Sequence, residues 1–179
     1  MLDLLLGLLG LIAIIIALGF VLPDRVRMSR EIVINAPREK VFAHVRDFQK
    51  WEAWLPWAKL DTNTQYTYEG NGVGHKMAWA SEKRDVGRGT QVITEIGAPR
   101  KMVSKLTFEG MGSATAAFKL SEIGDSETKI VWSFDTNMRE DIAIHMKPMA
   151  TYIGMFMMKG ALGKQFEDGL QSLKSIVES

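Results

Sequence analysis

The fold of this chain is decided by residues 26–42, VRMSREIVINAPREKVF, in which a strand pattern gives way to a helix pattern. Apolar and polar residues alternate through residues 26–34, with Arg30 interrupting the apolar face, and this period of two predicts a half-buried strand. Pro37 then marks the expected first position of a helix, because its fixed φ suits the helical backbone and its missing N–H costs nothing there. Apolar residues at helical spacing predict that this helix ends near Arg46.

The preceding stretch, residues 2–22, is almost entirely apolar: LDLLLGLLGLIAIIIALGFVL. At 1.5 Å per residue it makes a helix about 31 Å long, which matches the hydrocarbon core of a bilayer. The alternative is a cleaved signal peptide, which needs a basic start, a shorter apolar core and a small-residue cleavage site, and this stretch has none of them. We therefore predict a transmembrane anchor in residues 1–23 and one further domain in residues 24–179.

Basic residues follow the anchor and none precedes it. By the positive-inside rule, this asymmetry predicts a single-pass membrane protein with its N-terminus outside and its soluble domain in the cytoplasm. Membrane lipid is therefore the first expected partner. The basic residues that follow the anchor are Arg25, Arg27, Arg30, Arg38 and Lys40.

Charge and composition narrow the classes of function. The 22 basic and 21 acidic residues give a net charge of +1, so no overall basicity indicates nucleic acid as a partner. The chain has no cysteine, which excludes disulfides, thiol nucleophiles and cysteine-ligated metals. His44, His75 and His145 lie far apart in the sequence, so no local metal motif exists and no cofactor is predicted.

The middle of the chain carries strand patterns separated by glycine-bearing turns. Alternation at a period of two predicts an antiparallel meander with one apolar face. For the third predicted strand the sequence allows two registers: either Val92 and Ile96 face the interior, or Ile93 does. Ahead of the meander, three tryptophans in residues 51–57 favour a packed corner over a binding platform. The predicted strands centre on residues 66–68, 77–79, 92–96, 102–108, 114–120 and 130–134.

Residues 148–177 are the long segment left to cover the apolar face, and their spacing predicts one long helix. Residues 149–162, MATYIGMFMMKGAL, are apolar nearly all round, and a helix of this kind is buried on every side or borders lipid. The second half is amphipathic. Its apolar stripe consists of Leu162, Phe166, Leu170, Leu173 and Val177.

Residues 30–42, REIVINAPREKVF, resemble the opening of the START-like (SRPBCC) superfamily. The tryptophan corner, the turn at residues 72–74 and residues 87–95 are similar to its polyketide cyclase/dehydrase and lipid-transport branch. The resemblance implies an α+β helix-grip fold, in which a curved antiparallel sheet of about seven strands surrounds a long C-terminal helix and a cavity for apolar ligands lies between them. It implies no catalytic residue, because members of the superfamily share no catalytic signature.

Candidate residues for the wall of such a cavity are mostly apolar side chains on the predicted inner face, together with a few polar groups. For any single one of them, simple filling of the core is the alternative. Lys159 has the further alternative of extending its charged end to solvent, and for His145 a place in a surface loop is favoured over a role as general base. The candidates are Met77, Trp79, Ser104, Phe108, Phe118, Trp132, Phe134, Tyr152, Met155, Phe156 and Lys159.

These observations predict a membrane-anchored binding domain for an apolar ligand such as a lipid or isoprenoid, acting as a carrier or sensor. An accessory subunit of a membrane protein complex is a second hypothesis, since Gly7, Gly10 and Gly19 would allow close helix packing. A cyclase or dehydratase acting in the cavity is a third, less favoured one. It requires polar groups such as His145, Tyr152 and Lys159 to converge inside.

Overall fold

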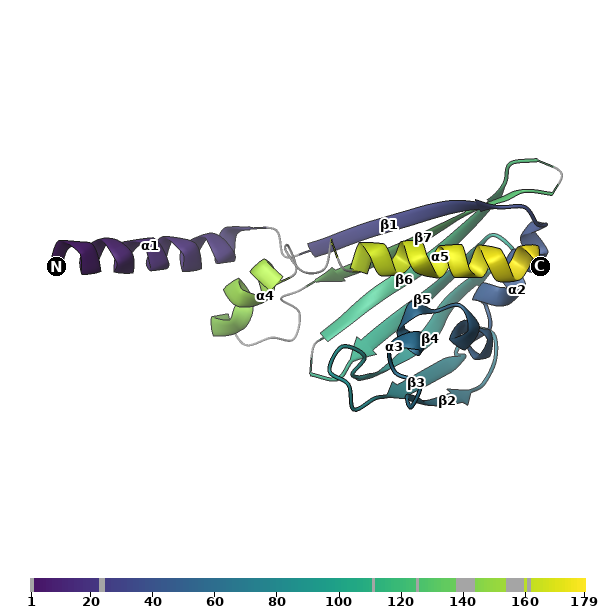
Figure 1. The fold of residues 1–179 in the computed structure, drawn as a ribbon, viewed down its shortest axis with the longest axis horizontal. Helices are drawn as coiled ribbons and strands as arrows, with labels where there is room; N and C mark the ends of the chain where they lie inside the picture. Colours follow the sequence, from purple (N-terminus) through teal and green to yellow (C-terminus); the bar gives the residue numbers. More distant parts are fainter. Residues whose placement is uncertain are drawn as a thin grey trace.

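A curved antiparallel sheet wraps around one long helix in the computed structural model of this chain (Figure 1). The structure describes residues 2–22, 25–110, 112–124, 126–137, 144–153, 160 and 162–179. The sheet has seven strands in the order β1-β7-β6-β5-β4-β3-β2, all antiparallel to their neighbours, so the predicted meander is confirmed. The strands are β1 (Arg25–Ile34), β2 (Gln65–Glu69), β3 (Lys76–Ala80), β4 (Arg88–Gly97), β5 (Lys101–Phe108), β6 (Gly112–Glu122) and β7 (Thr128–Asn137).

The helices divide into two groups. One group covers or closes the sheet, whereas α1 extends away from it and α4 lies beside the C-terminal part of α1 (Figure 1). This arrangement confirms the α+β helix-grip prediction. The helices are α1 (Leu2–Val21), α2 (Arg38–Val45), η1 (Phe48–Ala53), α3 (Pro56–Leu60), η2 (Ile144–Met146), α4 (Lys147–Ile153) and α5 (Gly163–Glu178).

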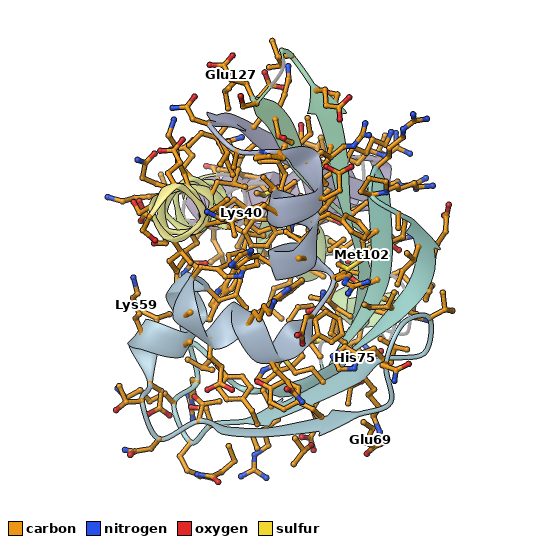
Figure 2. The ribbon with its side chains drawn as sticks, turned by 90° about the vertical axis from the view of Figure 1, so that its right-hand side faces the viewer. Lys40, Lys59, Glu69, His75, Met102 and Glu127 are labelled. Atoms are coloured by element: carbon orange, nitrogen blue, oxygen red, sulfur yellow. The ribbon has the colours of Figure 1, made fainter. Side chains whose placement is uncertain are left out.

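The strand register builds an inner face, which is the face of the sheet turned toward α5. Side chains that lie opposite one another on paired strands share a face, and Arg30 pairs with Trp132, Trp132 with Phe118, and Phe118 with Met102. Trp132 also stacks on Phe166 of α5, with ring centroids 3.8 Å apart. Viewed from the end remote from α1, the sheet curves around a side-chain-filled interior that includes Met102 (Figure 2).

A β-bulge resolves the register that the sequence left open in β4. Ile93 pairs with Ser104 and Ile96 with Met102, and the register shifts by one residue between Ile93 and Glu95. The extra residue breaks the period of two, so Ile93 and Ile96 both face the interior although an odd number of positions separates them. Strict alternation predicted one or the other, which is why the sequence pattern was ambiguous there.

Helix α5 is fixed to the edge strand β1 by polar contacts. The Arg30 Nε donates to Glu167 Oε1 at 2.5 Å, and its guanidinium lies over Gly163, where an added Cβ would meet Nη2 at 2.5 Å. Further along, Lys174 Nζ donates to the Val33 carbonyl at 2.8 Å. Arg30, which interrupts the apolar face of β1, therefore holds the beginning of α5.

The tryptophan corner is packed as predicted. Trp51 and Trp54 are buried, and the Trp51 indole N–H donates to the Val45 carbonyl at 2.9 Å. The helix before this corner begins one residue later than expected, because Pro37 occupies the N-cap position of α2 and not its first turn. The proline still marks the helix start, since its φ of −57° is compatible with either position.

The prediction of one helix over residues 148–177 is wrong. Helix α4 contacts α1, whereas α5 packs on the sheet, and the two are separate elements (Figure 1). Helix α4 ends at Ile153, and α5 begins at Gly163. The apolar surface of α4 also has its own partner in α1, so it is not needed to cover the sheet.

An ion-pair cluster joins the first residues of β1 to β7. Arg25 donates to both carboxylate oxygens of Asp135, at 2.6 and 2.8 Å, and Arg27 donates to one of them at 3.0 Å. The hydrogen bonds from Arg25, and then the one from Arg27, hold the pKa of Asp135 below its usual value. The folded-state pKa is thus lower than the unfolded one, so this carboxylate stabilises the fold at neutral pH.

We expect Asp135→Asn to lower the free energy of unfolding at pH 7 by at most about 1 kcal/mol, because the cluster is partly exposed. The difference from the wild type should vanish as the pH falls through the folded-state pKa, below about 4, where the wild-type carboxylate is protonated as well. Urea unfolding at a series of pH values measures this. The exposed Glu109→Gln is the control, and an equal loss at every pH would contradict the assignment.

Candidate functional site

Seven of the predicted wall residues share the inner face of the sheet. The side chains of Phe118 and Trp132 are stacked at 5.1 Å, and Phe134 contacts Phe166 of α5 edge-on at 6.2 Å. The interior is therefore lined by aromatic rings at its centre, and their role in ligand binding remains a prediction. The seven residues are Met77, Trp79, Ser104, Phe108, Phe118, Trp132 and Phe134.

A few polar groups interrupt this aromatic wall. Gln91 and Ser104 are both buried, and Gln91 Nε2 donates to Ser104 Oγ at 2.8 Å. Among the described residues, the buried indole N–H groups of Trp54 and Trp132 have no hydrogen-bond acceptor. Unpartnered buried donors are rare in folded proteins. Two indole donors and an amide–hydroxyl pair are therefore buried among the aromatic side chains.

Gln91 was not predicted as a wall residue. It stands in β4 beside the open register, and a glutamine with apolar neighbours has no sequence signature that separates an inner from an outer position. Only the pairing of Gln91 with Met77 on one side and Leu106 on the other shows that it faces inward.

Burial decreases toward the end of the sheet at which β1 begins. Trp79 and Phe108 form the outermost aromatic pair there, with centroids 5.7 Å apart, and both are half-buried. Gly89 lies between them in the register, and a Cβ there would lie 2.5 Å from both the Thr107 carbonyl oxygen and the Trp79 ring. The glycine therefore lets the Trp79 ring lie close to the backbone of β4, at the end of the sheet nearest α1.

The remaining predicted residues do not join this wall in the described structure. Tyr152 lies on α4, and its hydroxyl donates to the carbonyl of Ile15 in α1 at 2.6 Å. His145 is exposed in η2, as the surface alternative anticipated. Met155, Phe156 and Lys159 fall outside the described residues, so their predicted roles stay predictions.

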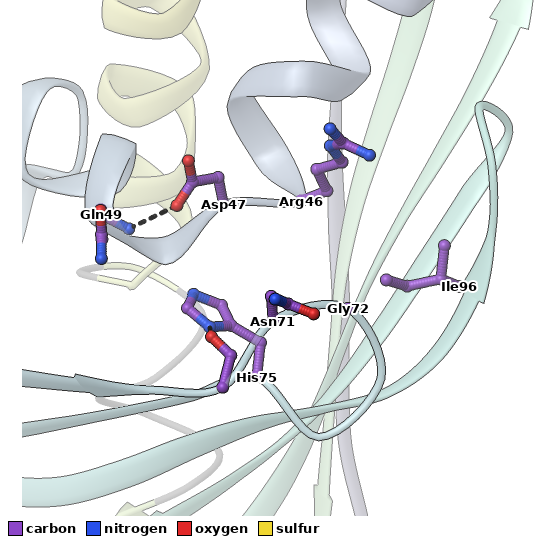
Figure 3. A pocket seen from close by; sticks show the side chains of 8 residues that line it. Arg46, Asp47, Gln49, Asn71, Gly72, His75 and Ile96 are labelled. Carbon is purple, nitrogen blue, oxygen red and sulfur yellow. Dashed lines mark hydrogen bonds between the residues drawn. The ribbon is translucent and has the colours of Figure 1, made fainter.

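Two surface hollows lie at the opposite end of the sheet. The larger, about 520 Å³, is formed where the end of α2 faces the β2–β3 turn, and it includes Arg46, Asp47 and His75 (Figure 3). His75 is buried, its Nδ1 lies 2.8 Å from the Gly70 carbonyl, and its Nε2 accepts from the Phe48 N–H at 3.3 Å. Both ring nitrogens are occupied, so this histidine stabilises the turn and is not free to act as a base.

The second hollow, about 380 Å³, shares Arg46 with the first and is bordered by Phe42 and Pro99. Both hollows are open to solvent and lie outside the aromatic interior. Among the described residues, no group of three or more histidine, cysteine or carboxylate side chains is placed to hold a metal ion.

Comparison with known proteins agrees with this architecture. The family described as polyketide cyclase/dehydrase and lipid transport matches residues 25–178. A search of curated protein sequences found no match.

Solved structures share the fold at low sequence identity. The Zhui aromatase/cyclase from Streptomyces sp. R1128 matches with a TM-score of 0.66 and 12% identity, over 86% of this chain and 94% of that one. A hypothetical protein from Helicobacter pylori gives 0.63 and 13%, over 87% and 89%. Norcoclaurine synthase from Thalictrum flavum gives 0.60 and 10%, over 86% of each chain. Together with its strand order and aromatic inner face, the match over residues 25–178 shows that this chain belongs to the polyketide cyclase/dehydrase and lipid-transport family.

Proposed function

We propose that the protein is a membrane-tethered binding domain for an apolar ligand, which it carries or senses at the membrane surface. The observation that carries this proposal is the aromatic inner face, which is buried at Phe118 and Trp132 and half-buried at Trp79 and Phe108. Sites for small apolar molecules are concave and mostly apolar, with a few placed polar groups. The family's description, which includes lipid transport, supports the same class of ligand.

The polar groups of the wall narrow the ligand further. Indole N–H groups only donate hydrogen bonds, whereas the Gln91–Ser104 pair can donate or accept. The charged groups beside the wall, Arg30 and Glu167, are paired with each other. The ligand we expect is therefore an uncharged apolar body with one or two acceptor oxygens, such as an isoprenoid or a lipid carrying a carbonyl or hydroxyl group.

Helix α1 supplies the proposed tether. It is the one helix of the described residues that is long and apolar enough to cross a membrane. We propose that it does so with its N-terminus outside and the domain in the cytoplasm. The basic residues Arg25 and Arg27, directly after the helix, support that orientation.

Two other functions have weaker support. Gly7 and Gly10 have no described atom within 4 Å of an added Cβ, so this part of α1 has room for another membrane helix, as an accessory subunit requires. An enzyme acting in the interior needs converging polar groups. Of its candidates, Tyr152 bonds to α1 and His145 is exposed, which disfavours that reading.

Extraction of the purified full chain tests the binding function. We expect an apolar molecule, identified by mass spectrometry, to co-purify with the wild type in mild detergent. Ala114→Leu fills part of the inner face and should reduce the recovered amount several-fold, because Ala114 is buried next to Leu106. Thr115→Leu adds similar volume one position along β6 but on the outer face, and should leave recovery unchanged.

Lipid bound to α1 is also recovered on extraction, so its amount needs a separate control. The control protein is residues 1–24 fused to an unrelated soluble domain. Recovery from the full chain that does not exceed recovery from this fusion would contradict the proposal. Equal recovery from Ala114→Leu and Thr115→Leu, both with wild-type circular dichroism, would contradict the inner face as the site.

A further inference from the structure

Helix α4 is docked on α1 through one position that lacks a side chain. A Cβ at Gly19 would lie 2.6 Å from the Cβ of Pro148 and 3.0 Å from a ring carbon of Tyr152. Any other residue at this position would push α4 away. Gly19 is one helical turn after Ile15, so the absent side chain also exposes the Ile15 carbonyl, and the Tyr152 hydroxyl donates to it at 2.6 Å.

This contact lies deep along the proposed membrane span. Ile15 precedes the last residue of α1, Val21, by six positions, which is about 9 Å at 1.5 Å per residue. Arg25 is the first residue of β1, beyond the helix. If α1 crosses the bilayer, the Tyr152 hydroxyl therefore sits below the level of the lipid headgroups, where an unpaired hydroxyl is costly. The hydrogen bond to the Ile15 carbonyl gives this hydroxyl its partner.

Apolar side chains are exposed on η2 and α4. Ile144 is 71% exposed and Met149 50% exposed, next to a helix whose own apolar side chains are exposed along its length. Arg25 and Arg27, which both pair with Asp135, lie at the beginning of β1, soon after α1 ends. A helix with an exposed apolar face is typical of elements that lie in the membrane interface.

We propose that η2 and α4 form a second membrane-contacting element, immersed in the cytoplasmic interface of the bilayer that α1 crosses. This proposal rests on the tether proposed above. Its partner is the lipid surface. Ile144 and Met149 enter the boundary between headgroups and acyl chains, while Gly19 and Tyr152 fix the depth of α4. The sheet end that carries Trp79 and Phe108 is thereby held against the bilayer.

Depth measurement on the full chain tests the proposal, and the absence of native cysteine makes single labels straightforward. The chain is reconstituted in phosphatidylcholine vesicles with a fluorescent label at Met149→Cys, at Leu11→Cys in α1, or at Val73→Cys in the remote β2–β3 turn. Quenching by acyl-chain bromine is compared with quenching by aqueous iodide. We expect the Met149 label to be quenched by bromine and protected from iodide, at about 5–10 Å depth. The Val73 label should show the reverse.

Substitutions at the docking position sharpen the test. In the Gly19→Leu variant, iodide should quench the Met149 label. In the Gly10→Leu variant, where the substitution lies in an open part of α1, the label should stay protected. Tyr152→Phe should also increase iodide quenching of the Met149 label, but by a smaller amount. A Met149 label quenched by iodide alone, beside a Leu11 label quenched by bromine, would overturn the immersion of α4 and leave the tether intact.

Two further outcomes also count against the inference. A Met149 label protected from both quenchers would show that protein covers α4, for example a second copy of the chain. A Leu11 label that bromine fails to quench would overturn the tether and this inference together.

Discussion

Replacing Trp132 by alanine is expected to destabilise the domain by about 3–5 kcal/mol. The ring lies between Phe118 and Phe166, with centroid distances of 5.1 and 3.8 Å, and meets Trp54 edge-on at 5.6 Å. Its removal opens a large cavity between the sheet and α5, and neighbouring rings cannot collapse into it without leaving their own contacts. Urea unfolding of the full chain in mild detergent, followed by far-ultraviolet circular dichroism, measures the loss.

Two companion variants show which property of the ring matters. Trp132→Phe should cost clearly less, because the indole N–H has no acceptor among the described residues and most of the stacking is kept. Ile123→Ala, at an exposed turn, should change the free energy of unfolding by no more than about 0.5 kcal/mol. A loss below about 1 kcal/mol for Trp132→Ala would mean that the interior beside the ring is already hollow.

Introducing two arginines at the centre of α1 is expected to detach the chain from the membrane. Leu8 and Ile12 are exposed and one turn apart, on a helix that is otherwise apolar through its centre. Each arginine costs about 2.5–3.5 kcal/mol at the middle of a span, so Leu8→Arg with Ile12→Arg costs about 5–7 kcal/mol on insertion. Flotation of membranes on a density gradient after an alkaline wash measures the attached fraction.

The matched control keeps the same positions apolar. Leu8→Ile with Ile12→Leu should float with the membranes as the wild type does. The arginine variant should retain the circular dichroism of the folded sheet, because Leu8 and Ile12 lie in α1, which extends away from the sheet (Figure 1). If the arginine variant floats as completely as the wild type, the chain is held at the membrane by something other than α1.

The sequence alone determined the elements whose signal is local. Outside β4 the strand cores have a period of two, and glycines mark the turns, so the meander and the predicted inner residues from Met77 to Phe134 follow from spacing. The apolar run of α1 and the amphipathic stripe of α5 are equally local. Recognition of the fold followed from residues 30–42 together with this element order.

The tertiary structure decided what depends on pairing between distant residues. The bulge after Ile93 changes which face Ile96 occupies, and only the register with β5 reveals it. The strand register likewise shows that Gln91 lies on the inner face.

The division of the C-terminal stretch into α4 and α5 depended on a contact across most of the chain. The spacing of apolar residues shows which face of a helix is apolar but not which surface that face packs against. Here α4 packs against α1 at Gly19, which lacks a side chain. Residues 149–153 gave the same apolar signal whether they were to cover the sheet or to lie against α1. Only the position of Tyr152 against Ile15 decided between the two.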